Sequence, residues 1–223
     1  MPRAISYPQK TVSYTGSAAD FIPPRPTLAK LREAAAGCRG CDLWAVGTQT
    51  VFGEGPRNAA VMFVGEQPGD QEDKTGVPFV GPAGRLLDAA LEQAGIDRRE
   101  VYVTNAVKHF KWERGEKGKR RIHKKPNDME IRACHPWLEQ EIALVKPRVI
   151  IALGATAAQS LLGKQFRVTK DRGKPIPTEF AKAVIATVHP SAVLRAPPES
   201  RQEAERQFFA DIKKAAKYIA ETA

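Results

Sequence analysis

Four short apolar runs, separated by segments with a helical pattern, constrain the fold of this chain more than any other feature. The runs lie at 59–64, 101–104, 149–153 and 184–188. Each run is apolar at consecutive positions, which is typical of strands that are covered on both faces. Strands of this kind that alternate with helices form parallel sheets. The sequence therefore predicts a three-layer α/β/α fold around a central four-stranded parallel sheet.

Helices are expected between these runs, where apolar residues recur at helical spacing. Pro82 is a favourable first helical residue, and Asn127 or Asp128 can cap a helix. The expected helices span 27–36, 82–94, 127–145, 155–162 and about 199–219.

The length of 223 residues suits a single α/β domain, which we expect over residues 26–223. Residues 1–25 are polar and contain several prolines, so we expect a loose N-terminal arm there. Hydrophobic residues make up 42% and charged residues 27%, as in soluble globular proteins. No apolar run is long enough to span a bilayer, and the first residues lack the apolar core of a secretory signal. We therefore expect a cytoplasmic monomer that does not engage a membrane.

Polar segments follow three of the four predicted strands. They are 65–73, Asn105 and 189–191. In folds of this class, ligands bind beyond the carboxyl ends of the strands. The segment 65–73 is rich in glycine and acid and lacks the lysine and serine of a phosphate-binding loop. Its carboxylates suit a general base or the orientation of a water molecule, although a polar surface turn has the same composition.

A strongly basic segment lies within a predicted loop at 109–126. Between Lys111 and Lys125 there are eight basic and two acidic residues, so the segment carries 8 − 2 = +6 of the net charge of +10. A concentrated positive charge favours polyanions such as nucleic acids. The alternative interpretation of this segment is a solvated lysine-rich loop.

Cysteine usage favours a metal site over disulfides, because the chain has only three cysteines. Cys38 and Cys41 form a C-x-x-C pair, a spacing that suits a metal ion, an iron-sulfur cluster or a redox pair. The pair follows a predicted helix with Gly37 as its cap, whereas a thioredoxin-like redox site follows a strand.

Several motifs in the same order resemble those of the iron-sulfur uracil-DNA glycosylases, similar to family 4. They are GEQPGDQED followed by PFVGPAGRLLD, then TNAVKHF, and finally HPSAVLR. The resemblance extends over about 28–219. It implies a uracil-DNA glycosylase-like fold and a catalytic domain that removes uracil from DNA.

The resemblance also implies roles for individual residues. Phe79 would stack on an extruded uracil, and Asn105 would read the base through its amide. His189 would bind a uracil carbonyl and stabilise the charge that develops as the base leaves. Ser191, in the same motif, is expected to contact the substrate, and a wedge that enters the DNA is expected within 193–195.

The same resemblance implies a metal site with one departure from the family. The family has four cysteine ligands, and the position of the third is occupied here by His109. Cys134 lies on the helix that carries the fourth. We therefore expect a structural [4Fe–4S] site of Cys38, Cys41, His109 and Cys134, with histidine ligation as in Rieske centres. Zinc accepts the same ligands and is the alternative.

A second departure, KRRIH at 119–123, resembles the insertion of the UdgX branch. In that branch the loop histidine, here His123, attacks C1′ of the deoxyribose after uracil has left. Glu66 would orient this imidazole and support the positive charge that it gains.

Other residues near this loop would assist. Gln67 and Asp73 would position groups, Asp70 and Asp73 would contact the substrate, and Arg121 would bind the loop or a phosphate. The expected partner is uracil-containing DNA, preferably single-stranded.

Two other functions fit parts of the pattern. The first is a conventional glycosylase that releases its product, with Glu66 positioning a water molecule. The second is a non-catalytic nucleic-acid-binding module with a zinc site, which would not account for the polar residues at the strand ends.

Overall fold

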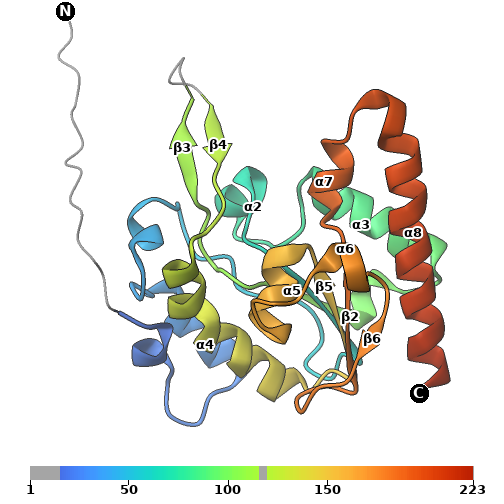
Figure 1. The fold of residues 1–223 in the computed structure, drawn as a ribbon. Helices are drawn as coiled ribbons and strands as arrows, with labels where there is room; N and C mark the ends of the chain where they lie inside the picture. The colour runs from blue at the N-terminus through green and yellow to red at the C-terminus, as the bar shows by residue number, and fades with distance from the viewer. Residues whose placement is uncertain (1–15, 116–119, 223) are drawn as a thin grey trace, which may run out of the picture.

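The computed structural model describes residues 16–115 and 120–222 and has a mostly parallel sheet at its centre (Figure 1). The strand order is β2-β1-β5-β7-β6. Four strands are parallel: β1 (Val61–Gly65), β2 (Val101–Asn105), β5 (Val149–Leu153) and β7 (Ala183–Thr187). These are the four strands predicted from the apolar runs, and every residue in them is buried.

A fifth strand at one edge corrects the predicted strand number. β6 (Pro175–Ile176) pairs antiparallel with β7. Two residues are too few to produce a recognisable apolar pattern, so this edge strand was missed.

Helices cover both faces of the sheet and complete the predicted three layers. One face packs against α4 (Asp128–Val145), α5 (Ala155–Leu162) and α6 (Val168–Asp171). The other packs against α3 (Pro82–Gln93), α7 (Pro190–Leu194) and the long α8 (Pro198–Glu221), which Figure 1 shows in red at one side. Two separate apolar clusters therefore form the core, one on each face.

Capping side chains set the starts of two of the helices. Thr27 caps α1 (Leu28–Ala36) by accepting a hydrogen bond from the Lys30 N–H at 3.2 Å. Asn127 caps α4 in the same way, and its own backbone N–H donates to Glu130 Oε2 at 2.7 Å in return. The predicted helix spans thus agree with the structure to within a residue or two.

Part of the predicted arm is packed against the domain. The short helix η1 (Ala18–Phe21) contacts α4, and Ala18 is fully buried. It joins a third apolar cluster with α1 and η2 (Asp42–Ala45). Residues 1–15, where the rest of the arm was predicted, lie outside the described residues.

A two-stranded hairpin replaces much of the predicted basic loop. β3 (Trp112–Arg114) pairs antiparallel with β4 (Arg121–His123). The hairpin projects from the body of the molecule beside α2 (Asp70–Thr75), a short helix within the predicted loop after β1 (Figure 1). Lys117 and Lys119 of the basic segment lie outside the described residues. The short helix η3 (Arg98–Glu100) precedes β2.

None of the helices in the described part of the chain combines the length and apolar character that a membrane span requires.

Candidate active site

A pocket of about 860 Å³ opens at the carboxyl ends of the parallel strands, beside the hairpin. Its wall includes most of the site residues expected from the sequence: Gln67, Asp70, Phe79, Asn105, Arg121, His123, His189 and Ser191. Glu66 and Asp73 do not line the pocket, but each contacts a residue that does. Segments that are far apart in the chain therefore converge here, as the strand topology predicted.

Phe79 is placed at the pocket by two glycines. Its backbone is left-handed, with φ of 59°, and its ring stacks on His189 with 6.4 Å between centroids. A Cβ on Gly65 would lie 2.8 Å from Phe79 Cζ, and a Cβ on Gly84 would lie 1.7 Å from the Phe79 carbonyl oxygen. Glycine at these two positions lets the backbone and ring of Phe79 approach this closely. A flat aromatic face is thus available for stacking.

Asn105 lies at the end of β2 with only 3% of its surface exposed. No described residue hydrogen-bonds its side-chain amide, so one acceptor and two donor hydrogens are available to a ligand. Its backbone carbonyl accepts from Lys108 Nζ at 2.8 Å, and Lys108 forms a fully buried ion pair with Glu141 at 2.5 Å. This buried pair anchors the strand end that carries the free amide.

His189 is uncharged at neutral pH. Burial lowers its pKa to about 4, and the Arg195 guanidinium and His123 act in the same direction. Its Nδ1 accepts a hydrogen bond from the Ser191 N–H at 3.1 Å, so the proton of the neutral ring lies on Nε2. No described residue accepts from this Nε2–H. His189 can therefore donate to an oxygen on which negative charge develops.

His123, at the end of β4, lies close to the polar side chains of Gln67 and Glu66. Its Nε2 lies 2.8 Å from Gln67 Nε2 and 3.5 Å from Glu66 Oε1. The Gln67 amide also donates to the Lys124 carbonyl at 2.9 Å and to the Lys111 carbonyl at 3.3 Å. In return, Gln67 Oε1 accepts from the Lys111 N–H at 3.0 Å. Gln67 thus connects the base of the hairpin to the loop after β1.

The protonation state of His123 suits a nucleophile. Burial has the largest influence and lowers its pKa, while the Glu66 carboxylate raises it and Arg195 lowers it further. A hydrogen bond from the Gln67 amide to Nε2 requires a lone pair there, so the ring proton lies on Nδ1. A neutral imidazole with its lone pair at Nε2 is the nucleophilic form of histidine.

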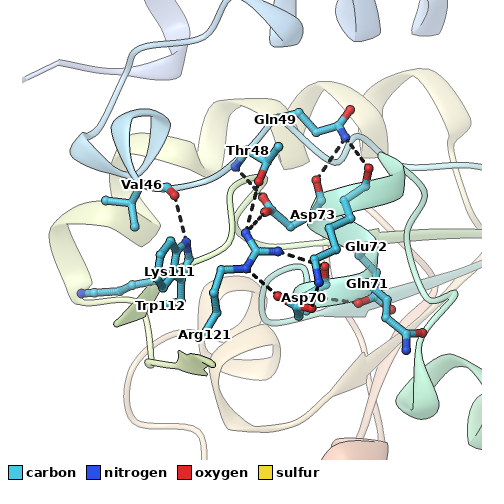
Figure 2. A network of polar contacts seen from close by, with 12 residues as sticks. Val46, Thr48, Gln49, Asp70, Gln71, Glu72, Asp73, Lys111, Trp112 and Arg121 are labelled. Carbon is cyan, nitrogen blue, oxygen red and sulfur yellow. Dashed lines mark hydrogen bonds and ion pairs between the residues drawn. The ribbon is translucent and has the colours of Figure 1, made fainter. Parts of the chain in front are cut away.

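Arg121 joins the hairpin to α2 (Figure 2). Its Nε lies 2.5 Å from Asp70 Oδ1 and its Nη1 lies 2.5 Å from Asp73 Oδ2. The guanidinium also donates to Thr48 Oγ1 at 3.1 Å and lies over the Trp112 ring at 5.3 Å. Asp73 is fully buried in this network, where its carboxylate binds Arg121, and it does not line the pocket. The substrate contact expected of Asp73 stays a prediction.

Comparison with known proteins identifies the family. The family model of the uracil DNA glycosylase superfamily matches residues 52–213, which is more than half of the chain. The chain belongs to the uracil DNA glycosylase superfamily.

Relatives within the superfamily are similar over most of their length. A type-4 uracil-DNA glycosylase of Thermotoga maritima is 41% identical over 183 residues, covering 82% of this chain and 89% of that protein. A type-4 enzyme of Sulfurisphaera tokodaii is 37% identical over 179 residues, covering 77% of each. A type-5 uracil-DNA glycosylase of Thermus thermophilus is 30% identical over 190 residues, covering 74% of this chain and 80% of that protein.

The crystal structure of the Pedobacter heparinus protein SMUG2 is similar in fold. It matches with a TM-score of 0.51 and 13% identity, over 72% of this chain and 77% of that chain. The similarity supports the uracil DNA glycosylase-like architecture of the sheet and its flanking helices.

The three cysteines of this superfamily member lie in one apolar cluster. Cys38, Cys41 and Cys134 are all buried, and burial raises the pKa of Cys41 to about 11. The Trp137 Nε1–H donates to Cys38 Sγ at 3.3 Å, and the Lys108 N–H donates to Cys134 Sγ at 3.2 Å. N–H···S bonds of this kind stabilise thiolates that bind metals, so the surroundings of the sulfurs fit such a role.

His109, the fourth predicted ligand, is also buried, and burial lowers its pKa to about 4. No described hydrogen bond connects its ring to a thiol. Across 16–115 and 120–222, no three or more His, Cys, Asp or Glu side chains are arranged so that they could bind a metal ion. The thiols therefore gather in one cluster without forming a complete ligand set.

Some residues of the site were not predicted from the sequence. Lys108 lies in the second motif, and its partner is Glu141 on the apolar face of α4. An acidic residue on an apolar helix face was the sequence signal that could have indicated this buried ion pair. Thr156 is a single polar residue shortly after the third strand, and it donates a hydrogen bond to Glu66. Leu194 and Arg195, by contrast, line the pocket and belong to the segment 193–195 where a DNA wedge was expected from the sequence.

Proposed function

We propose that this chain removes uracil from DNA and then becomes covalently linked through His123 Nε2 to C1′ of the deoxyribose. The observation that carries the proposal is the placement of His123 on the pocket wall, with its Nε2 within 3.5 Å of Glu66 Oε1 and bound by Gln67. The linkage would be the behaviour of the UdgX branch.

Uracil recognition would use three residues of the pocket wall, Phe79, Asn105 and His189. Phe79 would stack on the flipped base, and the free amide of Asn105 would pair with its polar edge. When the C1′–N1 bond breaks, its electron pair leaves with uracil. The Nε2–H of His189 would then stabilise the negative charge on a uracil carbonyl.

Covalent capture would follow at the sugar. The electron-poor C1′ would accept the Nε2 lone pair of His123, which forms a C–N bond and leaves a positive charge on the imidazole. The Glu66 carboxylate, 3.5 Å from this nitrogen, would stabilise that charge. The Nδ1 proton could then pass to solvent.

A conventional glycosylase is the second candidate, and the names of the relatives favour it. The most similar proteins described above are named type-4 uracil-DNA glycosylases. In this mechanism Glu66 would position a water molecule that attacks C1′, and the enzyme would release DNA with an abasic site. His123 would then only contact DNA.

A denaturing gel separates the two mechanisms. We expect equimolar uracil-containing single-stranded DNA to convert the protein into a species that survives SDS and has the added mass of the DNA. His123→Ser should lose this species and retain some uracil release. Many turnovers with free abasic DNA, and no shifted species, would contradict covalent capture but not uracil excision. Absence of uracil release would contradict both.

A [4Fe–4S] cluster on Cys38, Cys41, His109 and Cys134 is a further part of the proposal, with zinc as the alternative. The buried thiols and their N–H donors support it. Such a cluster would stabilise the fold and would take no part in the reaction, because all its positions would be filled by protein ligands.

Substrate form and assembly complete the proposal. The positive hairpin is compatible with a preference for single-stranded DNA, and we propose a cytoplasmic monomer. Competition between single-stranded and double-stranded uracil DNA tests the preference, and sedimentation tests the assembly.

A further inference from the structure

The end of the central strand β5 lies between two strands that carry functional residues. β1 leads to Glu66 on one side, and β7 leads to His189 on the other. The turn that follows β5, residues 154–156, contacts both.

The contact with Glu66 is a hydrogen bond from Thr156. The Thr156 side chain lies in the first turn of α5 and is 3% exposed. Its Oγ1 donates to Glu66 Oε2, while the other carboxylate oxygen, Oε1, lies 3.5 Å from His123 Nε2. The two oxygens of Glu66 thus have different partners, and Thr156 binds the one that does not face His123.

The contact with His189 is a close packing against Gly154. A Cβ on Gly154 would lie 3.0 Å from His189 Cβ, and its φ of 90° is in the region that favours glycine. The same turn therefore fixes the distance between the base of His189 and the carboxylate of Glu66. A shift of this turn would change both.

We propose that Thr156 is a positioning residue for Glu66: its hydroxyl orients the carboxylate so that Oε1 faces His123 Nε2. This inference rests on the proposed role of Glu66 in the reaction at C1′. Without the hydroxyl, the carboxylate can rotate about its side-chain torsions, and the distance from Oε1 to Nε2 is no longer fixed. A hydrogen bond to a charged group stabilises one geometry over others by an amount that corresponds to about tenfold to a hundredfold in rate.

Three variants test the proposal. Thr156→Val keeps the branched shape and removes the hydroxyl, whereas Thr156→Ser keeps the hydroxyl. Ser160→Ala is the matched control, because it removes a hydroxyl of the same helix that, among the described residues, bonds only to the Ala157 carbonyl, at 2.8 Å. Single-turnover rates of uracil release and of covalent product formation are measured for each with uracil-containing single-stranded DNA.

We expect Thr156→Val to slow covalent product formation about tenfold to a hundredfold, with Thr156→Ser and Ser160→Ala close to the wild type. In a Glu66→Ala background, Thr156→Val should cause no further slowing, since the two residues act through one interaction. A merely structural loss would persist in that background. Persistence there, a wild-type rate for Thr156→Val, or an equal loss for Thr156→Ser would overturn the inference.

Failure of the proposed capture is distinguishable from failure of this inference. If the wild-type protein forms no covalent species but releases uracil, the capture mechanism fails. The same variants are then compared by their rates of abasic-site formation, because a water-positioning Glu66 depends on the same hydroxyl. Equal rates for Thr156→Val and the wild type in that assay would overturn the role of Thr156.

Discussion

Gly65 determines how closely Asn105 and Phe79 can approach each other. A Cβ at this position would lie 2.3 Å from Asn105 Oδ1 and 2.8 Å from Phe79 Cζ. Both neighbours are buried, so neither can move away without disturbing the pocket. The smallest possible addition of volume therefore falls on the two residues proposed to bind the base.

Gly65→Ala should lower the rate of uracil release by about a hundredfold or more, because displacements of an ångström in a catalytic site have costs of this order. Single-turnover release measures it. Gly95→Ala provides the contrast: its Cβ meets nothing within 4 Å, but its φ of 71° is unfavourable for alanine. This control should lower the melting temperature and leave release unchanged. Normal release by Gly65→Ala would contradict the proposed base site.

The pKa values of the two histidines predict how the reaction depends on pH. Attack by His123 needs a neutral ring, and the position of His189 depends on an unprotonated Nδ1 that accepts from the Ser191 N–H, so each rate should fall as pH falls through the pKa of the ring concerned. The pKa of His123 lies below 6.5, so covalent capture at pH 6.5 should still exceed half of its plateau rate. His189 has a pKa of about 4, so uracil release should stay constant from pH 8 to about 5.

Rapid-quench measurements at constant ionic strength follow both rates across this pH range. A midpoint for capture above pH 6.5 would contradict a neutral, partly buried His123. A fall in uracil release between pH 7 and 6 would contradict the assignment for His189.

At the scale of elements, the hairpin and α2 are connected through one guanidinium. Arg121 has two carboxylate partners on α2, and it is only 17% exposed. The short hairpin has three pairs of facing residues, so its position relative to the pocket depends on such contacts with the domain. His123 lies two residues along the same strand, so its position depends on that of Arg121.

Arg121→Lys should slow covalent capture about tenfold and leave uracil release almost unchanged, because a lysine lacks the planar fork whose two nitrogens bind Asp70 and Asp73. The two single-turnover rates measure this separation. Arg98→Lys is a suitable control, since Arg98 pairs with Asp88 on the surface away from the pocket. Equal losses of capture and release would indicate a general disturbance of the site and contradict the role given to the hairpin.

At the scale of the whole molecule, the apolar cluster that contains the three cysteines packs the N-terminal segment against the long helix α4. Cys38 and Cys41 follow α1, and Cys134 belongs to α4. A metal group at this point would link three elements that otherwise meet through apolar contacts. Its loss would reduce the stability of that end of the domain.

Protein purified without oxygen should be brown and contain iron and inorganic sulfide, since iron-sulfur clusters are coloured and zinc is not. Cys134→Ser should lose the colour and lower the melting temperature. Visible absorption, elemental analysis and thermal melts measure these outcomes. A colourless protein with one equivalent of zinc would favour the alternative metal, and a metal-free protein of unchanged stability would contradict both.

Most of the architecture was predictable from the sequence, because short runs of consecutive apolar residues such as 149–153 are typical of buried strands. The residues at the ends of those strands were predictable for the same reason. Features that depend on pairing between distant or short segments were not. The hairpin contains only three residues in each strand and lies within a basic run, and the bond from Thr156 to Glu66 spans ninety positions.

The side-chain amide of Gln67 has two hydrogens but three acceptors within reach: the carbonyls of Lys111 and Lys124, and Nε2 of His123. In the free protein, therefore, the two hydrogens cannot fully satisfy all three acceptors at once. Once Nε2 is bonded to carbon it no longer accepts, and the two hydrogens match the two carbonyls that fix the hairpin. On the proposed mechanism, bond formation at His123 therefore removes one of the three acceptors that share the two hydrogens of the Gln67 amide. In the linked state, the number of these hydrogens equals the number of acceptors.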